Sequence, residues 1–126
     1  LLGVCENWMT PALFLSVTFI AGAVISFFTG SSWGTFAICI PIAVPMAYSF
    51  TGGQLGTLVY AAVGAVVSGG LFGDHCSPVS DTSVLSSLGA ACDHIDHVRT
   101  QLPYALLAAA VSIILWIVVA LVGGAA

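Results

Sequence analysis

The placement of charge restricts this chain more than any other feature. Between Glu6 and Asp74 lie 67 consecutive residues without a charged side chain, and 27 uncharged residues follow Arg99. Charged residues make up 5% of the chain, against about 25% in soluble domains. Most of the chain must therefore lie in lipid or against other apolar helices. The sequence predicts an all-α, polytopic membrane protein.

The few charges and cysteines exclude several classes of function. A formal net charge of −4 with a single basic residue provides no patch for nucleic-acid phosphates and no polybasic lipid anchor. The cysteines form no C-x-x-C pair, which argues against a zinc knuckle and a disulfide framework; they are Cys5, Cys39, Cys76 and Cys92. We expect them to be packing residues, and we expect no nucleic-acid partner, no cofactor and no resident metal.

Three apolar runs have about the length of one bilayer crossing. Residues 11–28 and 55–72 form runs of 18, and residues 102–122 form a run of 21, close to the ~20 residues that a spanning helix needs. Pro11 stands at the first position of its run, where proline is compatible with a helix start. We expect these runs to be spanning helices.

A cluster of small and hydroxyl residues, 29–35, interrupts the apolar pattern after the first run. The next run, 36–50, has 15 residues and contains Pro41 and Pro45, so as a helix of roughly 22 Å it would be kinked and too short to span. Two geometries fit. One is a re-entrant hairpin with residues 29–35 as its polar tip, which we favour, and the other is a single segment unwound in its middle.

A second interruption follows the run 55–72, at residues 73–82. Ser77 followed by Pro78 is typical of a helix start, with the hydroxyl as N-cap and proline at the first helical position. We expect the preceding helix to end in this segment and a further small-residue helix, started by Ser77 and Pro78, to run to about Ala91. This makes a second broken helix.

Two breaks in so short a membrane chain indicate an ion site. Broken backbone in a bilayer is tolerated where protein or water satisfies it, and transporters place substrates there, near the midplane. Asp74 and Asp81 supply the hard anionic oxygens that small cations prefer. Neutral oxygens come from the first break, with freed carbonyls beside them: Ser31, Ser32 and Thr35. Low dielectric disfavours a carboxylate and a bound cation favours it, so one aspartate can exchange a proton for a cation.

Simpler interpretations of the same residues stay open. Asp81 lies in a predicted first helical turn, where the helix dipole alone favours a carboxylate, and Ser77 fits a capping role better than direct ligation. A loop at the membrane surface would leave both aspartates solvated. Small-residue turns also serve plain helix packing.

The polar stretch 93–101 has a different pattern. Asp93 followed by Asp96 resembles an N-cap with an acidic first turn, and His94 and His97 share one helix face. Either this stretch is a solvated interfacial helix, together with Arg99, or its histidines form a relay or pH sensor. A metal site with His75, Cys76 and Cys92 fits no zinc spacing.

Two long strings resemble a known family. They are G-D-H-C-S-P-V-S-D-T at residues 73–82 and C-D-H-I-D-H-V-R-T-Q-L-P-Y at residues 92–104. Both are similar to the C-terminal part of sodium/proton antiporters of the NhaC type, and residues 29–35 look like that family's small-residue motif. The resemblance covers nearly the whole chain.

The resemblance implies a multi-pass secondary transporter of the bacterial or archaeal cytoplasmic membrane that exchanges sodium ions for protons. Some members couple these ions to organic anions such as malate and lactate, or to amino acids. Members have two related halves; because this chain begins with Leu1, we expect it to be a fragment whose partners are the lipid bilayer, the missing N-terminal half and, in a homo-oligomer, further copies. The resemblance assigns the cation site to Asp74, Ser77, Asp81, Thr82, Ser31, Ser32 and Thr35, with His75 as a proton partner.

Three rival functions remain. An organic-anion transporter would use helix N-termini and Arg99. A membrane-embedded metalloenzyme would be built on the aspartates with His75, His94 and His97, although the chain shows no activated nucleophile. A purely structural subunit would use none of these groups chemically.

Overall fold

The computed structural model describes residues 9–123, so Cys5 and Glu6 lie outside the described residues. Across that range all regular structure is helical, in the order α2 (Pro11–Thr29), α3 (Ser32–Phe50), α4 (Thr57–Cys76), α5 (Asp81–Gly89) and α6 (His94–Gly123). All but α5 are long and apolar enough to cross a membrane. The predicted all-α membrane fold is confirmed.

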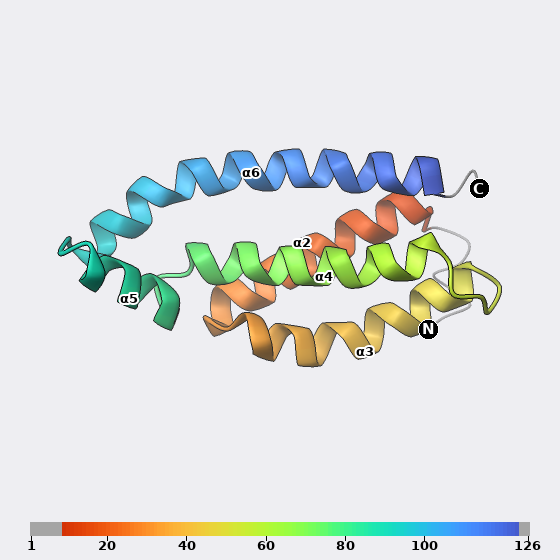
Figure 1. Ribbon diagram of the computed structural model, residues 1–126, viewed down its shortest axis with the longest axis horizontal. Coiled ribbons are helices and arrows are strands. Elements are labelled where there is room, and N and C mark those ends of the chain that lie inside the picture. The colour runs from red at the N-terminus through yellow and green to blue at the C-terminus, as the bar shows by residue number, and fades with distance from the viewer. Residues whose placement is uncertain (1–8, 124–126) are drawn as a thin grey trace.

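Helix α4 lies at the centre of the arrangement, with α3 and α6 on either side and α2 crossing it (Figure 1). The crossing with α2 is very close because α4 presents glycines to it. A β-carbon at Gly69 would collide with the carbonyl oxygen of Phe19, and one at Gly73 with that of Ala23. Small residues at a helix crossing allow this approach in lipid, where packing drives association.

Helices α2 and α3 form an antiparallel hairpin, as the favoured geometry predicted. The break between them is only Gly30 and Ser31, shorter than the predicted seven residues. Gly30 ends α2 in the left-handed region at φ 67°, and the Ser31 hydroxyl accepts a hydrogen bond from Gly34 N. Because this cap starts α3 four residues before Phe36, α3 has 19 residues and a length of roughly 28 Å. The prediction that this segment is too short to span was wrong.

The second break also differs from its prediction. Helix α4 continues through Asp74 to Cys76, and the non-helical segment is residues 77–80. Ser80, and not Ser77, is the N-cap of α5, with its hydroxyl accepting from Thr82 N at 3.2 Å. Ser77 Oγ accepts from Val79 N at 3.2 Å, but the residues that follow form a turn and not a helix.

Helix α6 is continuous over 30 residues, and the polar stretch forms its first turns. Asp93 caps it as predicted, because Asp93 Oδ1 accepts from Ile95 N at 2.9 Å and from Asp96 N at 3.2 Å. Along its length only Ala109 and Ala120 are buried among the described residues. Its many exposed apolar side chains suit a lipid environment.

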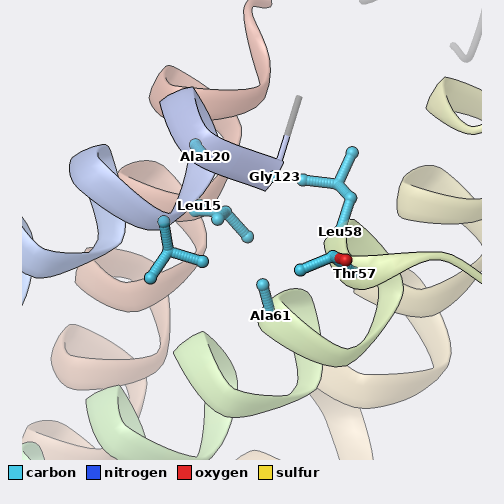
Figure 2. Close-up of a pocket in the computed structure, with 7 residues that line it drawn as sticks. Leu15, Thr57, Leu58, Ala61, Ala120 and Gly123 are labelled. Atoms are coloured by element: carbon cyan, nitrogen blue, oxygen red, sulfur yellow. The ribbon is translucent and has the colours of Figure 1, made fainter. Parts of the chain in front are cut away.

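The end of the molecule opposite to α5 holds a small cavity between three helices. Leu15 of α2, Ala61 of α4 and Ala120 of α6 surround this cavity of about 10 Å³ with Thr57 and Gly123 (Figure 2). A space of this size holds at most about one water molecule. The breaks on which the sequence analysis placed the candidate site lie at the other end.

Candidate functional site

The last part of α4 and the residue that follows it are anchored to the C-terminal part of α2 by two serine hydroxyls. Ser77 Oγ donates to the carbonyl oxygen of Phe27 at 2.6 Å, and Ser26 Oγ donates to that of Gly70 at 2.6 Å. Both serines are fully buried. Buried hydroxyls need such partners in an apolar interior, so these bonds fix where α4 stops relative to α2.

The two breaks of the chain touch each other. A β-carbon at Gly30, in the α2–α3 turn, would lie 2.8 Å from the carbonyl oxygen of Val79, in the α4–α5 break. Glycine is required here twice over, by this contact and by its positive φ. Residues about 50 positions apart thus form one region.

Asp74 is the buried charged residue of this region. It lies in the last turn of α4 with 5% of its surface exposed, and Ser80 Oγ donates to its Oδ1 at 2.6 Å. Arg99, the single lysine or arginine of the chain, is exposed on α6.

Ser80 is the residue of this region that the sequence analysis did not select. It is fully buried and links Asp74 to Thr82, whose Oγ1 lies 2.7 Å from Ser80 Oγ. A signal was present, since a serine directly before Asp81 fits an N-cap followed by an acidic first turn. The stronger Ser77–Pro78 signal masked it.

Asp81 differs from Asp74 in its exposure and in its hydrogen bonds. It is the first residue of α5, it is exposed, and its Oδ1 accepts from Thr82 N at 2.9 Å. This is the arrangement of a carboxylate that stabilises a helix N-terminus. The break therefore links Asp74 to Thr82 through Ser80, whereas Ser77 bonds to α2 and Asp81 is exposed.

The three hydroxyl residues predicted from the first break lie at the start of α3. Ser31 is half-buried and caps the helix, while Ser32 and Thr35 are buried. Thr35 Oγ1 donates to the carbonyl oxygen of Ser31 at 3.0 Å. Its Cγ2 would lie 3.5 Å from a β-carbon at Gly70, one turn before Asp74. Thr35 is therefore a neighbour of α4, and the hydrogen bonds of Ser31 and Thr35 stay within the start of α3.

His75 faces a different space from Asp74. Its Nδ1 lies 3.0 Å from the carbonyl oxygen of Leu71, and its exposed ring lines a cleft of about 430 Å³ between α4 and α6, shared with Gln101 and Tyr104. Asp74 is absent from the lining of this cleft. Gln101 lies where the polar part of α6 meets its apolar run. Because His75, in the last turn of α4, shares a cleft with Gln101, this end of α4 lies near one end of the long helices and not at their middle.

His94 is joined to the break more directly than His75 is. Its Nε2 lies 2.7 Å from the carbonyl oxygen of Pro78, and its Nδ1 lies 3.3 Å from Ser87 Oγ of α5. His97 is half-buried one turn further along, and Asp96 and Arg99 are exposed. Among residues 9–123 no three His, Cys, Asp or Glu side chains are grouped closely enough to hold a metal ion, which gives the metalloenzyme hypothesis no site in that range.

The comparison with protein families decides which kind of protein carries this break. A model of the Na+/H+ antiporter family matches residues 4–121. The chain belongs to this family. It is accordingly a multi-pass membrane protein of a transporter family and not an enzyme, and the resemblance found in the sequence is confirmed.

Individual relatives agree with this assignment. The chain is 52% identical to an uncharacterized protein of Haemophilus influenzae, over 86% of this chain and 20% of that protein. It is 36% identical to the malate-2H(+)/Na(+)-lactate antiporter of Bacillus subtilis, over 94% of this chain and 24% of the relative. It is 32% identical to the Na(+)/H(+) antiporter NhaC of Alkalihalophilus pseudofirmus, over 88% and 23%. The chain thus spans about a quarter or less of these relatives, and no solved structure matches it significantly.

Proposed function

We propose that this chain is the C-terminal membrane portion of a longer sodium/proton antiporter of the cytoplasmic membrane, and that Asp74 is its ion-exchange group. The observation that carries the proposal is a buried carboxylate at a helix break, hydrogen-bonded by Ser80. Family membership supports sodium ions and protons as the substrates. An N-terminal half of the transporter would supply the remaining protein walls.

In the proposed mechanism, a proton and a sodium ion compete for the same carboxylate. A proton neutralises Asp74 in the low-dielectric interior, and a sodium ion stabilises its anionic form instead. Because Asp74 cannot hold both, loading the cation from one side requires release of the proton. The carboxylate oxygens of Asp74, the buried anionic group of this region, are the ligands that we assign to the sodium ion.

Coupled transport of an organic anion is the second candidate, because the Bacillus subtilis relative is named for malate and lactate. An anion site here would need the N-terminus of α5 or Arg99. The α5 N-terminus already carries the Asp81 carboxylate, and Arg99 is exposed on α6. We therefore assign this region to cations, and an organic anion would bind elsewhere in the transporter.

Asp74→Asn tests the proposal, with Asp81→Asn as the matched control. Each variant of the full-length transporter is compared with the wild type in vesicles by measuring sodium-dependent proton movement with a pH-sensitive dye. The sequence alone predicts that both substitutions abolish exchange. The burial of Asp74 and the exposure of Asp81 predict that only Asp74→Asn does. Retained exchange in Asp74→Asn, with normal membrane insertion, would remove Asp74 from the mechanism.

A further inference from the structure

Three oxygen atoms connect the interior of the break to its exposed edge. Asp74 Oδ1 lies 2.6 Å from Ser80 Oγ, which in turn lies 2.7 Å from Thr82 Oγ1. Asp74 and Ser80 are buried, and Thr82 is exposed. The chain of hydroxyls therefore begins at a shielded carboxylate and ends at the surface.

The direction of these hydrogen bonds follows from counting donors. An ionised carboxylate only accepts, so the single hydroxyl hydrogen of Ser80 points to Asp74. The hydrogen between Ser80 and Thr82 must then come from Thr82. Ser80 Oγ also accepts from Thr82 N at 3.2 Å, so its donor and both acceptor positions are used.

We propose that Ser80 and Thr82 are the proton relay of this site, carrying protons between Asp74 and the outside while the sodium ion uses its own path. The inference rests on the proposed function, because it assumes that Asp74 exchanges a proton. It adds a role that cation ligation does not require, namely the transfer of the proton along ordered hydroxyls.

The transfer is balanced in three coupled steps. The proton on Asp74 Oδ1 moves to Ser80 Oγ, the original hydroxyl proton of Ser80 moves to Thr82 Oγ1, and the original proton of Thr82 moves to a water molecule. Each oxygen breaks one O–H bond and the next one forms one. At the end both hydroxyl groups are intact, with Ser80 donating to the ionised Asp74 and Thr82 donating to Ser80. The net products are a carboxylate and a hydrated proton.

The relay gives a nearly buried carboxylate a path of hydroxyl groups to the surface. Ser80 has no exposed surface and Asp74 has 5%, and Thr82 is the exposed residue at the end of this chain of oxygens. A methyl group in place of the Thr82 hydroxyl would leave Ser80 without its hydroxyl partner. Proton release along this path would then stop at Ser80.

Thr82→Val is the decisive variant, because it removes one hydroxyl and keeps the shape of the side chain. The backbone N–H of residue 82 remains, so the N-cap bond to Ser80 is preserved. Thr82→Ser restores the hydroxyl. Ser86→Ala is the control for a hydroxyl on the same helix, since Ser86 is exposed and donates to the Thr82 carbonyl oxygen at 2.8 Å.

Two transport modes of the full-length protein separate proton transfer from sodium binding. Sodium–proton exchange requires the relay, whereas exchange of radioactive sodium against unlabelled sodium moves no proton. We expect Thr82→Val to slow sodium–proton exchange about 100-fold, the lower end of what a positioned proton-transfer group contributes. Sodium–sodium exchange should keep its wild-type rate, and Thr82→Ser and Ser86→Ala should be normal in both modes.

The other outcomes overturn the relay in distinguishable ways. Equal loss of both modes in Thr82→Val would assign the hydroxyl to the cation site or to folding. Normal rates in both modes would show that protons bypass Thr82. A wild-type protein without sodium-dependent flux in either mode would remove the proposed antiport function, and the relay with it.

Discussion

Ser77 and Phe27 join two helix ends through one buried hydrogen bond, in which the Ser77 hydroxyl donates to the Phe27 carbonyl oxygen at 2.6 Å. Phe27 belongs to the last turns of α2, and Ser77 directly follows α4. The bond satisfies one of the last carbonyls of α2, which lack a partner within the helix. It therefore couples the position of the break to the hairpin.

Ser77→Ala should destabilise the protein because it leaves the Phe27 carbonyl without this partner in a buried site. An unsatisfied buried group costs about 1–3 kcal/mol. The loss of stability is measured by a thermal-shift assay of the purified transporter in detergent. Ser86→Ala, which removes an exposed hydroxyl, should fall within about 0.5 kcal/mol of the wild type. Equal stability of the two variants would contradict a structural role for Ser77.

Gly30→Ala should be more damaging than Gly52→Ala, although both glycines have a positive φ, 67° and 64°. The backbone strain is therefore similar in the two variants. A β-carbon at Gly30 meets the Val79 carbonyl oxygen at 2.8 Å, whereas one at Gly52 meets nothing within 4 Å. The difference in thermal stability and in sodium–proton exchange isolates the contact between the breaks. Similar effects of both substitutions would show that this contact contributes little.

Gly69→Ala should separate α4 from α2, since the added carbon collides with the backbone of Phe19. Overpacking of this kind costs about 1–3 kcal/mol. Gly89→Ala is the matched control because a β-carbon there meets nothing within 4 Å. Thermal unfolding should show a large decrease for the first variant and little change for the second, and an unchanged Gly69→Ala would contradict the close crossing.

The sequence predicted the helices well because long apolar runs leave few alternatives in a membrane. It misplaced their ends, which depend on single capping bonds. Ser31 starts α3 before Phe36, and α4 extends past Asp74 because its last turn packs against α2 through Gly73. Such tertiary contacts carry no local sequence signal.

The candidate site was predicted only in part, for the same reason. Asp74 stood out as a carboxylate next to an apolar run, but no local pattern distinguishes its burial from the exposure of Asp81. Ser80 was missed because its role depends on a side chain six residues away. The pairing of His94 with Pro78 joins residues 16 positions apart and could be found only in the fold.

His94→Ala should loosen the break, and Cys76 reports on it. The substitution removes the His94 bonds to Pro78 and Ser87. Cys76 ends α4 directly before the break and is buried, with 1% exposed, so a thiol reagent reacts with it only when the break opens. Loss of about 1 kcal/mol of hydrogen bonding raises the open population about fivefold. In a protein with its other cysteines replaced by serine, the labelling rate of Cys76 by a maleimide should rise by that factor.

His97→Ala is the control for this measurement, because His97 lies one turn further along α6 and is also half-buried. His97→Ala removes an imidazole of the same size but leaves the two His94 hydrogen bonds intact. The labelling rate of Cys76 should therefore stay near that of the wild type. If the two histidine variants accelerate labelling equally, general loosening of α6 is responsible. Only a selective effect of His94→Ala attributes the closed state of the break to the bond between its imidazole and the Pro78 carbonyl.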